Sequence, residues 1–172
     1  MQRDFHFYLV GILARHAGFS DDEAITIATA SQYVDDATES VPLKLTDGRL
    51  VETTMTAHYH VRSLSRGVQT KVFMPFHFPP RGLQDGRFSY VTERDAPLIR
   101  RLLGELVEEG RRARTDRGGI AWRRFLHGLG VALHTYADSW AHEGFSGREH
   151  RENDVGRIWF AKGDQRAWKR QL

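Results

Sequence analysis

The chain of 172 residues contains no cysteine, and this absence narrows its chemistry at once. Without thiols the protein can form no disulfide and can offer no thiolate ligand to a metal ion. Any metal site must therefore use histidine, carboxylate, backbone or water ligands.

Long apolar runs are also missing from the sequence. No stretch approaches the roughly 18 consecutive apolar residues of a membrane-spanning helix, so we expect no transmembrane segment. The N-terminal stretch MQRDFHFYLVGILARHAGF lacks the basic start, uninterrupted apolar core and small-residue cleavage site of a signal peptide. A cytoplasmic location is the resulting expectation.

Internal repeats and low-complexity linkers are absent as well, and the composition is that of a folded domain. Charged residues make up 27% of the chain and hydrophobic residues 40%, as in ordinary globular proteins. The formal net charge is +3, and basic residues concentrate in residues 100–119 and near the C-terminus. Solvated helix faces explain these basic clusters more simply than phosphate-bearing partners do, although a basic surface favours such partners.

Helical signals recur along most of the chain. Apolar residues at helical spacing end at Gly18, which is suited to a helix cap, and Ser20 with Glu23 forms a capping box. Pro97, just after Asp95, marks another helix start. We expect helices over residues 3–17, 21–36, around 57–67, from 95 to about 114, after Gly118-Gly119, and from about His150.

Two segments break this helical pattern. Asp47-Gly48 lies between β-prone stretches and predicts a small hairpin. Residues 72–82, VFMPFHFPPRG, are aromatic and proline-rich, and we expect them to be irregular. The predicted fold class is therefore mainly α, a single-domain helical bundle with a small β-hairpin insertion. We expect this domain over residues 1–162 and a basic C-terminal tail over residues 163–172.

The segment LHTYADSWAHEGFSG carries the most informative pattern, because His134, Asp138 and His142 follow one another at intervals of four residues. An α-helix turns about 100° per residue, so a step of four returns to nearly the same face. Two histidines and one carboxylate on a single stripe suit a d-block cation such as zinc. Asp138 is central and has two oxygens, so it can bridge two ions.

Further candidate ligands lie elsewhere in the sequence. A lone histidine in an amphipathic helix is more often a core or capping residue than a ligand, and His/Asp pairs one turn apart also arise as salt bridges. Helices packed side by side can nevertheless aim such groups at a common point, which predicts a metal cluster between the helices. The additional candidates are His6, Asp35, Asp36, His58, His60, His150 and Asp154.

In chain order these residues resemble the zinc-dependent phospholipase C superfamily, which includes single-strand nucleases. That pattern has a His near the N-terminus, an Asp after an aromatic residue, a His followed by an aromatic, a helical His-x3-Asp with a further His, and a closing His-x3-Asp/Glu. The chain also resembles uncharacterised bacterial proteins with DFH, SQYVDD and H-x3-D-x3-H motifs. The matching positions are His6, Asp35, His58, His134, Asp138, His142, His150 and Asp154.

The resemblance implies a centre of two or three zinc ions, with iron or manganese as other metals to consider. The family completes its third ion with a processed N-terminal Trp, whereas residue one here is Met1. Asp4 is a candidate replacement ligand, and Asp36 and His60 are possible additional ligands. The loop between His142 and His150 is also shorter than in much of the family.

The reaction that the resemblance implies is hydrolysis of a phosphate ester, either a phosphodiester or a phosphomonoester. Asp138 would bridge the ions, and Asp35 would bind one ion and orient the attacking water. Lipid headgroups, nucleic acid and small phosphoesters all stay open as substrates. Candidate substrate contacts are Arg148, Arg151 and Tyr33, although exposed loop charge and core packing explain these residues equally well.

Two other histidines receive no role in this site. His77 lies in the proline-rich segment that can line the cleft, with little to support its assignment. His127 lies seven residues before His134, and core packing is the simpler expectation for it.

Two further kinds of protein fit the same ligands. Histidines and carboxylates on packed helices also hold di-iron centres in oxidases and oxygenases, although the Glu-x2-His pattern of such sites is not evident here. Alternatively, the metals are structural and hold together a small binding module without catalysis. The oligomeric state cannot be read from the sequence.

Overall fold

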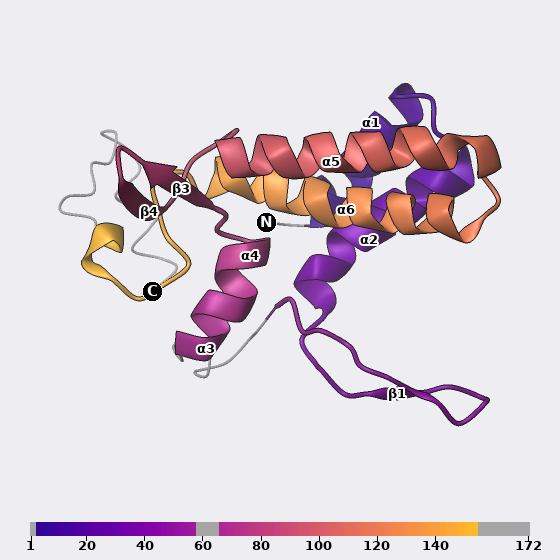
Figure 1. The fold of residues 1–172 in the computed structure, drawn as a ribbon, viewed down its shortest axis with the longest axis horizontal. Coiled ribbons are helices and arrows are strands. Elements are labelled where there is room, and N and C mark those ends of the chain that lie inside the picture. The colour runs from indigo at the N-terminus through magenta and orange to yellow at the C-terminus, as the bar shows by residue number, and fades with distance from the viewer. Residues whose placement is uncertain (1–2, 58–65, 155–172) are drawn as a thin grey trace, which may run out of the picture.

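The computed structural model describes residues 3–57 and 66–154, whose arrangement is shown in Figure 1. The chain starts with one continuous helical run, in which the π-helical η1 (Asp4–Leu9) leads directly into α1 (Val10–His16). Gly18 follows with a φ of 90°. Because this left-handed conformation favours glycine, Gly18 ends the helix as its position predicted.

Helix α2 (Asp21–Asp36) begins at the predicted capping box. The Ser20 hydroxyl accepts a hydrogen bond from the Glu23 N–H, and a Glu23 carboxylate oxygen accepts one from the Ser20 N–H. The second Glu23 oxygen accepts a hydrogen bond from the Trp122 indole at 2.7 Å. Trp122 lies in the first turn of α6 (Ile120–Ala141), so the starts of α2 and α6 are joined.

Helix α5 (Pro97–Ala113) and helix α6 lie side by side and run in opposite directions (Figure 1). Both occur where Pro97 and the Gly118-Gly119 break predicted them. A short 3-10 turn, η4 (Arg114–Asp116), connects them. The apolar core lies between α1, α2, the end of α5 and the first half of α6; it comprises Val10, Ala14, Ala24, Ile27, Ala113, Trp122, Phe125 and Leu126.

A short first hairpin follows α2. Its strands, β1 (Leu43–Lys44) and β2 (Leu50–Val51), are antiparallel and exposed. The turn holds Asp47 and Gly48, and Gly48 has a φ of 86°, so the predicted hairpin is confirmed. In Figure 1 this hairpin projects away from the helical bundle.

The segment around residues 72–82 is more regular than its proline content suggested. The elements α3 (Arg66–Val68), the π-helical η3 (Gln69–Phe73) and α4 (Met74–Phe76) form consecutive helical turns that end at His77. The expectation of an irregular segment was wrong for residues 72–76, which continue this helical run, whereas residues 77–79 are irregular. Pro75 fits the run because its fixed φ of about −65° is a helical value.

A second hairpin follows this helical run and was not predicted. Strand β3 (Pro80–Gln84) pairs antiparallel with β4 (Arg87–Thr92). Asp85 and Gly86 between them have φ values of 49° and 75°. Positive φ at both central residues is the type I′ geometry for which an Asp-Gly pair is well suited.

The mainly α class with a small β insertion is confirmed, although the described residues form two hairpins instead of one. The helix predicted from about His150 is wrong within the described range, which contains only the 3-10 turn η5 (Arg151–Asn153). Most of the helix predicted around residues 57–67 and the whole tail at 163–172 lie outside the described residues. Within residues 3–57 and 66–154, no helix combines the length and apolar content that crossing a membrane requires.

The feature that positions the functional site is the close, parallel contact of α2 with α6. At Gly130 a Cβ atom would lie only 2.4 Å from the Ile27 carbonyl oxygen and 2.7 Å from the Ala30 Cβ. Only glycine allows the two backbones to approach so closely. One turn further along both helices, this contact brings Asp35 beside His134.

We expect the substitution Gly130→Ala to destabilise the protein by about 1–3 kcal/mol, because the added methyl group must push α2 and α6 apart. The matched control is Gly104→Ala on the exposed side of α5, where a Cβ meets nothing within 4 Å. That change should stabilise the helix by about 0.5–1 kcal/mol through its backbone entropy. Urea unfolding measures both, and equal effects of the two substitutions would contradict the close-contact explanation.

Candidate metal centre

Imidazole and carboxylate side chains from distant parts of the chain converge where η1, α2, the end of α4 and α6 meet. We call this group the His/Asp cluster. Its members are His6 in η1, Asp35 in α2, His77 just after α4, His134 and Asp138 in α6, and His142 just after α6.

The helices of this region place each ligand by simple geometry. His134 and Asp138 lie one turn apart in α6 and are both fully buried, as the spacing of four predicted. His6 is the buried residue of η1. Both η1 and η3, which leads toward His77, are π-helical, and such turns occur often at functional sites.

The tightest part of the cluster is a triangle of possible ligand atoms. His77 Nδ1 lies 3.0 Å from Asp138 Oδ2 and 3.1 Å from His134 Nε2, and His134 Nε2 lies 3.3 Å from Asp138 Oδ2. A proton can satisfy one edge of this triangle, whereas a cation can satisfy all three atoms. Tetrahedral zinc ligands at about 2.0–2.1 Å from the metal lie roughly 3.3 Å apart, so these atoms fit a zinc-sized ion.

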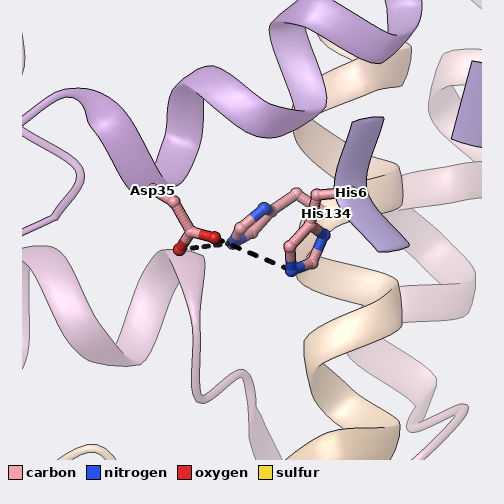
Figure 2. A group of neighbouring side chains, drawn as sticks. All are labelled: His6, Asp35 and His134. Carbon is pink, nitrogen blue, oxygen red and sulfur yellow. Dashed lines mark ion pairs between the residues drawn. The ribbon is translucent and has the colours of Figure 1, made fainter. Parts of the chain in front are cut away.

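A second and looser group shares His134 with the triangle. Asp35 Oδ2 lies 3.9 Å from His6 Nε2, and Asp35 Oδ1 lies 3.8 Å from His134 Nε2. Figure 2 shows the Asp35 carboxylate reaching from α2 toward the two imidazoles. The rings of His6 and His134 stack with their centroids 3.9 Å apart. These three side chains also lie close enough to hold a metal ion.

Both carboxylates face His6 with one oxygen and other imidazoles of the cluster with the second oxygen. Asp138 presents Oδ1 to His6 at 3.3 Å and Oδ2 to His77 and His134. Asp35 presents Oδ2 to His6, and its Oδ1 lies 3.7 Å from His77 Nδ1. Each carboxylate thus faces two sets of imidazoles, one set with each oxygen.

Several buried nitrogen atoms of the cluster lack a hydrogen-bond partner in the described part of the chain. Among the described residues, neither ring nitrogen of His6 has a hydrogen-bond partner, and His134 Nδ1 has none. Buried polar groups normally have partners, and exceptions call for a specific explanation. A cation bound within the cluster provides one for the His6 nitrogen that faces Asp35 and Asp138.

The electrostatics favour the metal-binding protonation state at three members of the cluster, Asp138, His134 and His142. Burial alone raises the pKa of Asp138, but the imidazoles of His134, His6 and His77 around its carboxylate outweigh burial and hold that pKa well below its ordinary value. Burial lowers the pKa of His134 despite the opposing effect of Asp138, and it lowers the pKa of His142 as well. An ionised carboxylate beside neutral imidazoles is the form that binds a metal ion.

His142 lies at the edge of the cluster and only partly follows the predicted stripe. Helix α6 ends at Ala141, and His142 has a φ of −105° and a ψ of 16°. Its Nε2 lies 3.7 Å from Asp138 Oδ2, and its ring stacks on Phe78 with centroids 4.3 Å apart. The His142 side chain is 30% exposed and that of Asp35 is 21% exposed. These two residues are therefore the most exposed members of the cluster.

His150 and Asp154 do not join the cluster in the described structure. His150 is extended, with a φ of −155°, so the two residues do not share one face of an α-helix as their spacing suggested. His150 Nδ1 instead accepts a hydrogen bond from the Glu152 N–H and lies 3.4 Å from Glu152 Oε2. It lines a separate pocket of about 370 Å³, together with Arg148 and Tyr90.

Other predicted site residues lie away from the cluster or outside the description. Asp4 and Asp36 are exposed, and the Asp36 carboxylate accepts a hydrogen bond from Gln32. His58 and His60 lie outside the described residues. The candidate substrate contacts are also accounted for locally, because Arg148 pairs with Glu152 and stacks on Tyr90, Arg151 is exposed, and Tyr33 is 64% exposed instead of packed in the core.

The structure adds one cluster member that was not assigned from the sequence, His77, and corrects the expectation for His127. His127 is exposed on α6 and contacts the Arg123 carbonyl oxygen, so it does not pack in the core. His77 comes from the segment expected to be irregular. His77 is 61 residues from Asp138 in the sequence, so helical periodicity could not predict the contact between their side chains.

The fold and the cluster define a mainly helical protein with a buried His/Asp group that can hold a metal ion. The chain belongs to the family of unknown function DUF6765, which it matches over residues 1–170. No curated protein and no solved structure matches it.

The metal-free protein should lose stability on acidification. The pKa values of His134 and His142 are lowered on folding, so unfolding takes up protons below the ordinary histidine value of 6.5. The lowered pKa of Asp138 adds stability that is lost as the pH falls below the ordinary carboxyl value of 3.8. Urea midpoints measured with chelator should be level above pH 6.5 and fall progressively below it.

The variant His142→Leu should reduce the loss of stability between pH 6.5 and pH 3.8. The control His127→Leu, which changes an exposed histidine on α6, should leave that loss unaltered. A midpoint that stays constant between pH 6.5 and pH 3.8 would show that burial of these imidazoles does not govern stability.

Proposed function

We propose that this protein is a metal-dependent hydrolase that acts on phosphate esters through a dinuclear or trinuclear zinc-type centre in the His/Asp cluster. The observation that carries the proposal is the division of both carboxylates between His6 on one side and His77 with His134 on the other. Carboxylates that face a different set of imidazoles with each oxygen are suited to bridging two cations.

Asp138 is the best candidate for the main bridge. Its side chain is fully buried, and its two oxygens lie 3.3 Å from His6 Nε2 and 3.0 Å from His77 Nδ1. A buried ionised carboxylate needs compensating partners on both oxygens, and a cation compensates its charge more fully than an imidazole contact does. Two divalent ions would provide them, which agrees with the bridging role expected from the sequence.

Metal ions bound there would lower the pKa of a coordinated water and stabilise the charge on a phosphoryl group. The protein's own residues would determine where the reaction occurs. Asp35 combines a place in the cluster with partial exposure, so its carboxylate can orient a water molecule that enters from solvent. The His142 side chain is also partly exposed and can contact the substrate.

The resemblance to zinc-dependent phospholipases C and nucleases supports this reaction class. The positions His6, Asp35, His134 and Asp138, which carry much of that resemblance, lie together in the cluster. The His followed by an aromatic residue in that pattern was matched at His58, which lies outside the described residues, and His77-Phe78 is a second such pair that lies in the cluster. The separate position of His150 leaves fewer ligands for a third ion.

A structural metal is the second candidate, and one observation favours it. His6, His134 and Asp138 are all fully buried, which is typical of a closed site that stabilises a fold. In that case chelation would unfold the protein, and no phosphate ester would be cleaved.

The variant His134→Ala should bind at least one metal ion fewer per chain than the wild type, because His134 belongs to both ligand groups. His127→Ala is the matched control, since it removes an exposed histidine from the same helix. Elemental analysis of protein purified without a metal-affinity tag gives the count and distinguishes zinc from iron or manganese. Equal metal content in all three proteins would rule out the cluster as the binding site.

The variant Asp35→Asn should lower phosphoesterase activity by about 10²-fold or more, because the neutral amide cannot orient and activate a water molecule as a carboxylate does. Bis(p-nitrophenyl) phosphate and p-nitrophenyl phosphate test the diester and monoester reactions, each with and without chelator. Asp36→Asn, at the exposed neighbouring position, should retain wild-type rates. A folded, metal-loaded wild-type protein that cleaves neither ester would contradict the hydrolase proposal for both simple ester classes.

A further inference from the structure

We infer that Thr56 is a positioning residue for the metal centre, which fixes the tautomer and orientation of His77 through its backbone carbonyl. This inference rests on the proposed metal-binding function of the His/Asp cluster. It concerns a residue outside the cluster that contacts no ligand atom itself.

The contact between Thr56 and His77 is short and directional. His77 Nε2 lies 2.8 Å from the Thr56 carbonyl oxygen. A carbonyl can only accept a hydrogen bond, so Nε2 is the donor in this contact, in competition with Nδ1, which faces the Asp138 carboxylate at 3.0 Å. A neutral imidazole has a single N–H, and the opposite nitrogen, Nδ1, is then left with a lone pair.

The nitrogen that Thr56 leaves unprotonated is the one that faces the cluster. His77 Nδ1 lies 3.0 Å from Asp138 Oδ2 and 3.1 Å from His134 Nε2. Metal-binding histidines commonly donate their other N–H to a carbonyl or carboxylate, which fixes the ring and the ligating nitrogen. The Thr56 carbonyl therefore presents the lone pair of His77 toward the position where a metal ion would bind.

The remaining groups of Thr56 fix its carbonyl in place. The Thr56 hydroxyl donates a hydrogen bond to the Val34 carbonyl oxygen at 2.8 Å, and the Thr56 N–H donates one to the Ala37 carbonyl oxygen at 2.9 Å. Val34 directly precedes Asp35 near the end of α2. Thr56 thus contacts both the end of α2, which carries Asp35, and the ring of His77. Asp35 and His77 are candidate ligands from different segments.

The test compares Thr56→Val, which keeps the branched shape but lacks the hydroxyl, with Thr56→Ser, which retains it. Thr26→Val is the matched control, because the Thr26 hydroxyl also donates to a carbonyl at 2.8 Å in α2, but in the first half of that helix. Two properties are measured: zinc affinity by competition with a chelator, and the His77 tautomer from ¹H–¹⁵N spectra of metal-free protein at about pH 8, above the ordinary histidine pKa.

In the wild type, His77 should carry its proton on Nε2. Thr56→Val should give a mixture of tautomers and weaken zinc binding by about 10-fold or more, as loss of an outer ligand contact does elsewhere. Thr56→Ser should retain the wild-type tautomer and zinc affinity, and Thr26→Val should match the wild type. A general loss of packing would not change the tautomer of one ring selectively.

Three results would overturn the inference: a wild-type His77 protonated on Nδ1, a Thr56→Val protein that matches the wild type in both measurements, or a Thr56→Ser protein that behaves as Thr56→Val. If Thr56→Val does not fold, the wild-type tautomer and the serine variant still decide. If the wild type binds no zinc, the proposed function fails, while the tautomer of the metal-free protein still tests the role of Thr56.

Discussion

The burial of the ionised Asp138 carboxylate is the constraint on which the site depends. Removing an isolated carboxylate from water costs several kcal/mol, so its burial requires compensating partners on both oxygens. His6, His77 and His134 come from three different segments to supply these contacts. The positions of the N-terminal helix and of the helical run before His77 are therefore linked to one residue in α6.

Much of the fold could be predicted because its signals are local. The capping box at Ser20 and the glycine after α1 act within a few residues, and both are where the sequence places them. The Asp-Gly pair at residues 85–86 is the same kind of hairpin signal as that at residues 47–48, but the prolines before it drew attention to irregular structure instead. Pro75 lies within the helical run, Pro79 in the short link before β3, and Pro80 at the start of that strand, where a missing N–H is tolerated.

The site was predictable only as far as helical geometry extends. His134 and Asp138 lie one turn apart within α6, so their spacing was sufficient, whereas the same spacing for His150 and Asp154 had no meaning because that segment is not α-helical. His77 was missed because its contact with Asp138 depends on tertiary packing. The one sequence signal that pointed to it, a His followed by an aromatic residue, also occurs at His58-Tyr59, and sequence alone cannot separate the two.

The distribution of exposure within the cluster limits what chemistry it can perform. His6, His134 and Asp138 are fully enclosed, so they can hold an ion but cannot meet a substrate. Asp35 and His142 are partly exposed, and both lie within 4 Å of other cluster atoms. A water molecule or phosphoryl oxygen would therefore reach the cluster at these two side chains and not at the enclosed ones. A hydrolytic centre requires partly exposed ligands, whereas a closed structural site has no need of them.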